Sequence, residues 1–405
     1  MKSILTVSFY ADFSRFFNEI GSQFGTETKM LNLCLCPSAY IYSKIHSQNS
    51  IFLPLAISLF DVSEVCQVEA GEDELRTICS YHTNPESYFN IANIYLSFFH
   101  YFLKKNNFDL IILSGDSRLA IRALDYMAKR LNIKTIYFEQ GPYGTTILDS
   151  KGVNANCSFR YNNDVLDDST AKNKALTRKI KKWKGHKKYR LFDYFFDYLK
   201  LTRQEFRDTK VSFSKKNVLI NRRSLPDEFI LLVLQVPEDA NMRCHSPFFK
   251  CHYDIVKSVY DSLPDGISLV IREHPLYRGA YEKELYKFIT ENDVFLSNDH
   301  DLEQSIKQSR LVVVNNSTVG IESLLLKKQV LVLGDAYYDN PSFVYKYNGD
   351  NLKKDIHEAI TNQLSPELVE KRLNYLFEEC FISGHFRELN NDFKDIARVI
   401  DGYLL

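Results

Sequence analysis

Residues 109–141, DLIILSGDSRLAIRALDYMAKRLNIKTIYFEQG, contain the pattern that decides the fold class. Residues 109–115 form an almost continuous apolar run, which is typical of a strand buried on both faces. Residues 117–131 then read as a helix, and residues 135–141 form a second apolar run that ends at a glycine. A strand, a helix and a second strand at this spacing predict a parallel β–α–β unit.

The same alternation recurs in the second half of the chain. Strands are predicted there at 229–236, 267–272, 294–297, 311–315 and 329–333, and helices at 248–262, 281–291, 302–308 and 319–326. We therefore predict an α/β protein with two Rossmann-type domains that face a central cleft, a GT-B-like architecture. The expected domains are residues 1–215, which include a basic helical segment at 168–215, and residues 216–405, which end in helices.

Composition limits the classes of partner. The 405 residues carry a formal net charge of zero, so the chain as a whole offers no electrostatic case for nucleic acid. The one basic concentration, residues 172–190, lacks an RNA-binding signature and is read as a solvated face or a contact for anionic lipid or glycolipid. The apolar stretch 88–103 is interrupted by polar residues and predicts a buried helix rather than a membrane span. With eight scattered cysteines, we expect a cytoplasmic protein, at most peripheral at the inner face of the membrane.

Polar motifs follow the predicted strands, where an open α/β sheet holds its ligands. Glu139-Gln140-Gly141 places a carboxylate at a strand end, as a general acid or base or as a surface side chain before a turn. Asp239, after the strand at 229–236, either faces a substrate or caps a helix.

Two further motifs are suited to a phosphate. His274 is restrained by Pro275 to extended geometry at a strand end, where its imidazole can donate to an anion. Residues 316–322, NSTVGIE, lead from a strand into a helix. The helix dipole and the hydroxyls of Ser317 and Thr318 predict an anion site, although an ordinary helix cap explains one hydroxyl equally well. Glu322 follows one turn later, within reach of a ribose.

A competing motif, Asp299-His300-Asp301, has the Asp-x-Asp pattern of metal-dependent transferases. It stands immediately before a short predicted helix, where acidic residues usually serve as caps. We therefore assign no metal ligands in this sequence.

In this order, the four motifs resemble those of the bacterial capsule-polysaccharide synthesis family, which includes retaining β-Kdo transferases. The resemblance covers roughly residues 108–335. The family's threonine/aspartate/glycine/asparagine stretch is similar to residues 145–154, which include Asp149 and Asn154. Two departures concern Gln140, where the family often has a second acidic residue, and the segment at 142–144, which is not a close match.

The resemblance implies an enzyme that transfers Kdo from CMP-β-Kdo, with retention, to a glycan or glycolipid in capsule or lipopolysaccharide O-antigen synthesis. It assigns the acceptor to the N-terminal domain and the CMP-sugar to the C-terminal one. Asp239 is implied as the nucleophile and Glu139 as the base that deprotonates the acceptor. No metal and no cofactor besides the donor are expected.

The remaining site residues also follow from the resemblance. Arg272 or Arg243 is a candidate to neutralise the sugar carboxylate. The residues implied to bind CMP are His274, Pro275, Asn316, Ser317, Thr318 and Glu322, and the acceptor-side candidates are Gln140, Gly141, Asp149 and Asn154.

Two other functions stay open at this point. Bacterial sialyltransferases are similar in combining an acidic–glycine motif with a His-Pro and a Ser-Ser/Thr element, and they use the same donor nucleotide with inversion. The other alternative is a non-catalytic subunit of a polysaccharide export assembly that binds a glycan or a nucleotide.

Overall fold

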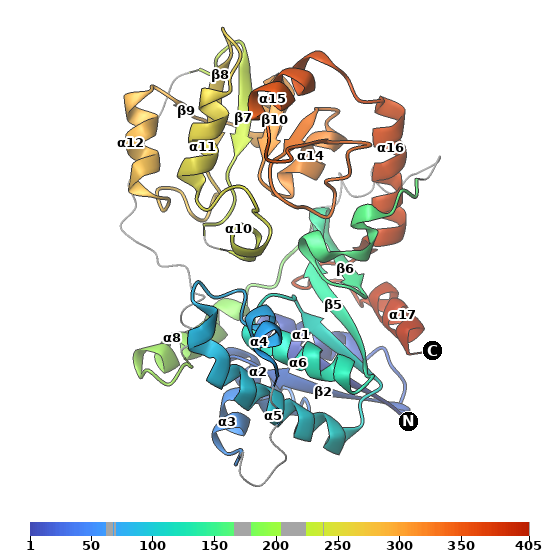
Figure 1. Ribbon diagram of the computed structural model, residues 1–405. Coiled ribbons are helices and arrows are strands. Elements are labelled where there is room, and N and C mark those ends of the chain that lie inside the picture. Colours follow the sequence, from blue (N-terminus) through green and yellow to red (C-terminus); the bar gives the residue numbers. More distant parts are fainter. Residues whose placement is uncertain (62–67, 69, 166–179, 204–223, 238, 405) are drawn as a thin grey trace. The chain divides into compact units, whose positions relative to one another are not determined.

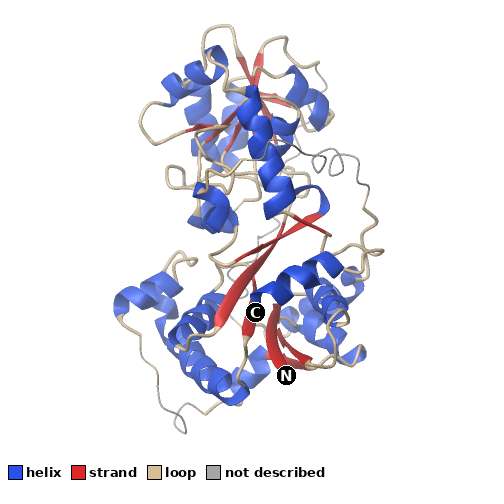
Figure 2. Cartoon of the chain, turned by 90° about the vertical axis from the view of Figure 1, so that its right-hand side faces the viewer, coloured by secondary structure: helices blue, strands red, loops and turns tan. Residues whose placement is uncertain are grey.

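The computed structural model describes residues 1–61, 68, 70–165, 180–203, 224–237 and 239–404 (Figure 1). The chain divides into two compact units. Unit 1 comprises Met1–Val153, Asn173–Lys210 and Glu378–Leu405, and unit 2 comprises Asn154–Lys172 and Val211–Phe377. Each unit is built on its own sheet, with helices beside the strands (Figure 2).

The sheet of unit 1 has the strand order β13-β6-β5-β4-β1-β2-β3. Its parallel part, β3-β2-β1-β4-β5, has the strand order of a Rossmann fold, and β6 and β13 extend it antiparallel to their neighbours. The strands are β1 (Lys2–Ser8), β2 (Thr28–Cys34), β3 (Ser50–Phe52), β4 (Leu110–Ser114), β5 (Lys134–Gln140), β6 (Thr145–Asp149) and β13 (Ile382–Ser383).

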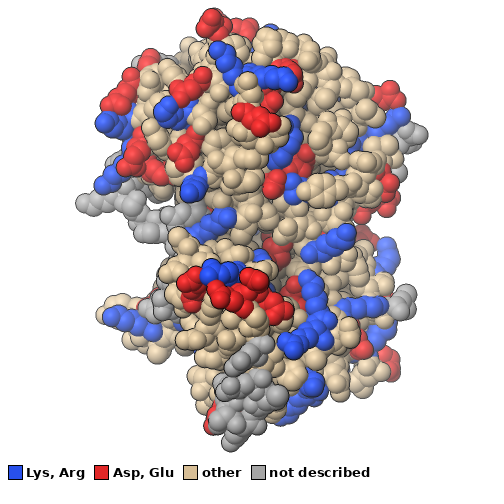
Figure 3. All heavy atoms as spheres, in the orientation of Figure 1, with Lys and Arg blue, Asp and Glu red and all other residues tan. Residues whose placement is uncertain are grey.

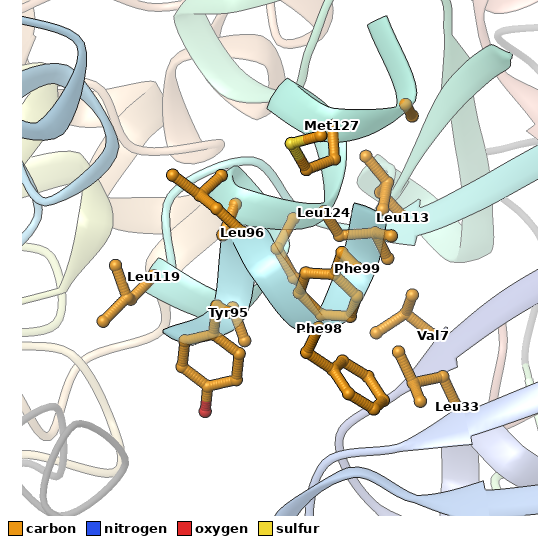
Figure 4. Packing of buried hydrophobic residues seen from close by; sticks show 14 of the residues in the cluster. Val7, Leu33, Tyr95, Leu96, Phe98, Phe99, Leu113, Leu119, Leu124 and Met127 are labelled. Carbon is orange, nitrogen blue, oxygen red and sulfur yellow. The ribbon is translucent and has the colours of Figure 1, made fainter. Parts of the chain in front are cut away.

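Helices cover both faces of this sheet. They are α1 (Ala11–Gly21), α2 (Pro37–Ile45), α3 (Leu53–Ser58), α4 (Glu72–Ile78), α5 (Phe89–Asn106), α6 (Leu119–Arg130), α8 (His186–Tyr198) and α17 (Lys394–Tyr403). Because successive side chains of a strand point to opposite faces, β4 contributes Ile111 and Leu113 to one core and Leu110 and Ile112 to the other. The first core is filled by α5 and α6 (Figure 4), and the second by α1 and α17.

Unit 2 repeats the arrangement with the strand order β12-β11-β10-β7-β8-β9, and all its strand pairs are parallel. The strands are β7 (Phe229–Val233), β8 (Ser268–Arg272), β9 (Phe295–Leu296), β10 (Leu311–Val314), β11 (Val330–Val332) and β12 (Tyr345–Lys346). The helices are α10 (Ala240–Cys244), α11 (His252–Asp261), α12 (Lys283–Glu291), α13 (Leu302–Gln308), α14 (Val319–Leu325), α15 (Leu352–Thr361) and α16 (Pro366–Tyr375). On one face of the sheet, Ile230, Leu269, Val313 and Leu331 pack against α11, α12 and α15.

The predicted α/β class with two Rossmann-type domains is confirmed, and most predicted strands and helices lie within a few residues of the observed ones. The apolar stretch at 88–103 is the buried helix α5, whose Tyr95 and Phe99 are fully covered. Over the described ranges, no helix combines the length and the apolar character that a membrane crossing needs.

The expected single boundary at residue 215 differs from the observed division. The C-terminal helix α17 belongs to unit 1, because Ile396 and Ile400 pack into the core beside α1, and β13 pairs with β6. In Figure 1 this red helix lies beside the blue-green strands of unit 1. Residues 154–165 belong instead to unit 2.

A buried charge cluster explains why residues 154–165 join unit 2. The guanidinium of Arg160 donates from Nε and Nη2 to the two carboxylate oxygens of Asp339, at 2.8 and 2.7 Å, and from Nη2 to Asp335 at 2.8 Å. Lys346 on β12 lies 3.1 and 3.2 Å from the same two carboxylates. Although burial would raise the pKa of Asp335, Lys346 and Arg160 hold it below its ordinary value.

Asp339→Asn keeps the side-chain shape but leaves the two cations with a single carboxylate. Because breaking a buried ion pair leaves an uncompensated charge, we expect unit 2 to lose about 3–5 kcal/mol in its free energy of unfolding. Hydrogen exchange of the β10 and β11 amides in urea measures the loss. The control is Asp261→Asn, which removes an exposed ion pair with Lys257 and should change little. Equal effects of the two substitutions would contradict this account of the cluster.

Candidate functional site

Three of the predicted motifs follow three neighbouring strands of unit 2. The strands β8, β7 and β10 lie side by side, and all are parallel, so their carboxyl ends share one edge of the sheet. The chain order of the strands reverses between β7 and β10, and this reversal is where open α/β sheets bind ligands. Residues after β7 lead to Asp239, those after β8 to His274, and those after β10 to Ser317.

Asp239 is half-buried and begins the short helix α10. Its Oδ1 accepts a hydrogen bond from the backbone N–H of Met242 at 3.0 Å, so the predicted helix-cap role is present. Burial raises the pKa of Asp239 to about 6, while the N–H groups of Met242 and Asn241 and the nearby His252 act in the opposite direction. A carboxylate with this pKa is ionised at neutral pH and poorly solvated, which suits a nucleophile.

A buried histidine lies behind Asp239. The imidazole of His252 packs edge-on against Tyr281, with ring centroids 4.9 Å apart, and its Nδ1 is 3.7 Å from Glu282. Although burial would raise the pKa of Glu282, its contacts with His252 lower it. The hydroxyl of Tyr281 donates to the backbone oxygen of Gln235 at 2.9 Å and accepts from the N–H of His274 at 3.0 Å. Tyr281 therefore joins the ends of β7 and β8.

His274 is half-buried at the end of β8, and burial lowers its pKa. The N–H of Leu276 donates to its Nδ1 at 3.3 Å, so the neutral ring carries its proton on Nε2. The adjacent Glu273 fixes this loop by accepting hydrogen bonds from the N–H of Gly279 at 3.1 Å, from Asn298 and from Tyr286. His274 is thereby held as a neutral donor at the sheet edge, and Pro275 beside it is exposed.

The helix α14 begins directly after Thr318, as predicted. The hydroxyl of Ser317 accepts from the N–H of Val319 at 3.3 Å, and Thr318 is exposed. The buried hydroxyl of Tyr338 donates to the backbone oxygen of Ser317. A Cβ at Gly320 would lie 2.3 Å from that hydroxyl, so only glycine permits this close approach.

Two buried amides complete this edge. Asn316 donates to the backbone oxygens of Asn241 and His245, at 3.1 and 3.0 Å, and thus ties the end of β10 to α10. Its Oδ1, and both amide atoms of Gln235 after β7, have no hydrogen-bond partner among the described residues. Gln235 is only 6% exposed, so an unpaired amide there is costly until a ligand or water supplies partners. The motif containing Gln235 was visible in the sequence, but nothing in it revealed an unpaired amide.

The two arginine candidates have different positions. The Nη1 of Arg272 donates to the backbone oxygens of Ser297 and His300, at 2.9 and 2.7 Å, which fixes the loop after β9. These two hydrogen bonds were not predicted from the sequence. Because they occupy the guanidinium of Arg272, this residue is the weaker candidate for binding the sugar carboxylate. Arg243 lies half-buried on α10, one turn after Asp239. Glu322 is half-buried on α14, and burial raises its pKa.

The acceptor-side candidates lie mostly in unit 1, so their part in chemistry stays a prediction. Glu139 is half-buried on β5 and accepts from the N–H of Gln140 at 2.8 Å. Gly141 opens the tight turn from β5 to β6, where a Cβ would lie 2.3 Å from the hydroxyl of Thr145. Asp149 closes a second turn, where its carboxylate accepts a hydrogen bond from the N–H of Lys151 at 2.7 Å. Asn154 is the first residue of unit 2 and has a left-handed backbone conformation, with φ of 52°.

The carboxyl edge of the unit 1 sheet holds a pocket that the sequence did not predict. Tyr10 after β1, Cys36 after β2 and Phe52 at the end of β3 line it, together with Arg118 and with Arg190 of α8. The guanidinium of Arg190 lies 3.7 Å from the ring centre of Tyr10. No sequence motif marks these residues, because they come from the ends of several separate elements.

The Asp-x-Asp motif is a helix cap, as expected. Asp301 accepts from the N–H of Gln304 at 2.9 Å at the start of α13, and Asp299 is an exposed partner of Arg278. Across the described ranges, no group of three or more His, Cys, Asp or Glu side chains is arranged to hold a metal ion.

Comparison with known proteins shows which family and which characterised proteins this chain is similar to. The family described as "Capsule polysaccharide biosynthesis protein" matches residues 109–387. Protein FixF of Sinorhizobium fredii is 33% identical over 164 residues, 40% of this chain and 40% of that protein. Capsule polysaccharide export protein KpsS of Escherichia coli is 25% identical over 278 residues, 60% of this chain and 71% of that protein.

A solved structure titled KpsC, beta Kdo 2,7 transferase, from Thermosulfurimonas dismutans covers 100% of this chain and 98% of its own. Its sequence identity is 14% and its TM-score 0.41, so we draw no functional conclusion from it. The match to the family extends over more than half of the residues. This chain therefore belongs to the capsule polysaccharide biosynthesis protein family.

Proposed function

We propose that this protein is a retaining glycosyltransferase that moves β-Kdo from CMP-β-Kdo to a glycan or glycolipid acceptor in capsule or lipopolysaccharide O-antigen synthesis. One observation carries the proposal. The half-buried carboxylate of Asp239 follows β7, and candidate phosphate donors follow the strands on either side of it, His274 after β8 and Ser317 after β10. Membership of the capsule polysaccharide biosynthesis family supports the biological setting.

In this proposal the CMP phosphate lies between β8 and β10. The Nε2–H of neutral His274 and the hydroxyls of Ser317 and Thr318 donate to it, and these bonds to a charged group are stronger than bonds between neutral groups. Gln235 and Asn316 supply the unpaired amide atoms of the same edge to the nucleotide or the sugar. Glu322 is the candidate for the ribose, and Arg243 the candidate for the sugar carboxylate.

The first chemical step is the displacement of CMP. A carboxylate oxygen of Asp239 attacks the anomeric carbon of Kdo, the bond from that carbon to the phosphate oxygen breaks, and CMP departs with the electron pair. The product is a glycosyl-enzyme ester on Asp239. Hydrogen-bond donors on the phosphate stabilise the charge that develops on the leaving oxygen.

The second step displaces Asp239. The acceptor hydroxyl oxygen attacks the same carbon, the ester bond breaks, and the carboxylate is regenerated. The hydroxyl proton passes to a base, for which Glu139 is the candidate. Two displacements at one carbon restore its starting configuration, which is the reason for proposing retention.

We place the protein in the cytoplasm, where activated sugars are made, with the basic segment 172–190 toward an anionic membrane surface or glycolipid. Residues 172–179 of that segment lie outside the described ranges. The direct test is incubation with CMP-Kdo and candidate acceptors, followed by NMR of the product anomer. A β product supports the proposal. Turnover of CMP-Neu5Ac alone would favour a sialyltransferase, and CMP binding without any turnover would favour a non-catalytic subunit of an export assembly.

Asp239→Asn should retain CMP binding and lose transfer by about a thousandfold or more, because the amide cannot form the glycosyl-enzyme. Kinetics and calorimetry measure the two effects. The wild type should gain the mass of one sugar, localised to the peptide with Asp239, in intact-protein mass spectrometry.

The matched control is Asp301→Asn, which also removes the charge of a helix cap in unit 2 but lies after β9. It should transfer Kdo at the wild-type rate.

In the wild type, kcat/KM should rise with pH through about 6 and level off above it, because Asp239 must be ionised to attack. Near wild-type transfer by Asp239→Asn would rule out double displacement at this residue.

Removing both hydroxyls, in Ser317→Ala/Thr318→Ala, should weaken CMP binding by about 1–3 kcal/mol, typical of lost hydrogen bonds to a charged group. Ser365→Ala provides the control, because the Ser365 hydroxyl caps α16 in the same unit at the N–H of Leu368. Calorimetry with CMP compares them, and an unchanged affinity of the double variant would place the phosphate elsewhere.

Turnover should persist in EDTA, because the proposed phosphate contacts come from protein N–H and O–H donors rather than from a metal ion. Measuring CMP release from CMP-Kdo with EDTA, and again after adding magnesium or manganese, tests this. Loss of turnover that either metal restores would show that the leaving group needs a cation.

A further inference from the structure

The helix α8 has two faces of different character. Arg190, Asp193 and Phe196 recur at helical spacing on the face that packs against unit 1, where they line the pocket at the ends of β1, β2 and β3. Leu191, Tyr194, Phe195 and Tyr198 recur on the opposite face and are 66, 61, 56 and 84% exposed. Figure 1 shows α8, in yellow-green, beside α2.

The inner face of α8, which carries Asp193, is held against α2 by specific contacts. Asp193 is buried, and its Oδ1 accepts from the N–H of Ser38 in the first turn of α2 at 2.8 Å. Just before the helix, the N–H of Trp183 donates to the backbone oxygen of Arg387 at 2.7 Å, and its ring packs edge-on against Tyr42. The outward direction of the apolar residues is therefore fixed by the fold.

The outer surface continues beyond the helix. Large apolar side chains exposed in this region are Leu191, Phe192, Tyr194, Phe195, Tyr198, Leu199 and Leu201, and we call them the α8 surface. Apolar residues gathered in this way, beside polar ones, mark an interaction site rather than ordinary surface. Phenylalanine, tyrosine and leucine are also the residues that enter the boundary between lipid head groups and acyl chains.

The fully exposed charges in residues 180–203 have one sign. Lysines at 181, 182, 184, 187, 188 and 200 are all exposed. Within residues 180–203 the acidic residues are Asp193, which is buried, and Asp197, which is half-buried. No ion pair among the described residues involves these lysines. Figure 3 shows acidic and basic residues interspersed over much of the protein face that it displays.

We propose that the α8 surface lies in the interface of an anionic lipid bilayer, with its apolar side chains among the acyl chains and its lysines at the head groups. Charge complementarity selects a bilayer over a second copy of the chain, because two α8 surfaces placed face to face would bring the lysines together. The apolar residues, rather than the lysine run alone, hold the protein at the membrane. A glycolipid acceptor would lie in the same bilayer, and this last step rests on the proposed function.

Flotation of the full chain with vesicles tests the proposal. We expect binding to phosphatidylcholine vesicles that contain about 30% phosphatidylglycerol and little binding to phosphatidylcholine alone. Phe195→Ser/Tyr198→Ser should lower partitioning about tenfold or more, because two inserted aromatic rings are lost. Lys187→Gln/Lys188→Gln should lower it only on anionic vesicles. Both pairs are exposed, so thermal unfolding should be unchanged.

The control is Leu368→Ser/Val399→Ser, which removes two exposed apolar side chains from α16 and α17 and should bind like the wild type. Normal vesicle binding by Phe195→Ser/Tyr198→Ser would overturn the proposal. So would a dimer in light scattering that only this variant abolishes, because the α8 surface would then be a contact between copies. Hydrolysis of CMP-Kdo without acceptor should be the same in all variants, so a failure of the donor chemistry is distinguishable from a failure of membrane binding.

Discussion

The burial of a parallel sheet on both faces constrains where this protein can place polar groups. Strand β7 reads Phe229-Ile-Leu-Leu-Val233, and each of its side chains is buried. In the sheet of unit 2 the polar side chains of the candidate site therefore follow the buried strands rather than interrupt them. Because parallel strands end at one edge, the residues after β8, β7 and β10 are brought together there although Asp239 and Ser317 are far apart in the chain. The candidate site depends on this constraint.

The same constraint explains which parts of the fold could be predicted. Buried strands are apolar runs, and the helices between them are amphipathic, so β4, α6 and β5 were visible in residues 109–141. The division into units was not visible, because it depends on pairs such as Arg160 with Asp339 and on the docking of Ile396 beside α1. An arginine in a loop gives no sign in the sequence of which distant carboxylate it will meet.

The candidate site was predictable to a similar extent. Strand ends and a His-Pro or Ser-Thr motif can be read locally, and these residues lie where they were expected in unit 2. Hydrogen bonding cannot be read in this way. The turn of Arg272 toward the loop after β9, the unpaired amide of Gln235 and the role of Glu273 in holding the His274 loop all depend on neighbours that fold in from elsewhere. The motif residues at β5 lie in unit 1 and stay predictions.

The packing of the C-terminal helix α17 in unit 1 affects the order in which the two units can fold during synthesis. Phe16 and Phe17 on α1 share a core with Phe393 and Ile400, so the two ends of the described chain complete one hydrophobic core. Domains usually fold in the order in which they leave the ribosome. Here the last residue of unit 2 is residue 377, so unit 2 can fold once that residue has left the ribosome. Unit 1 begins first, but one apolar face of its sheet stays uncovered until residues 394–403 have been synthesised. The nascent chain should therefore expose the Phe16 side of its sheet to chaperones throughout the synthesis of unit 2.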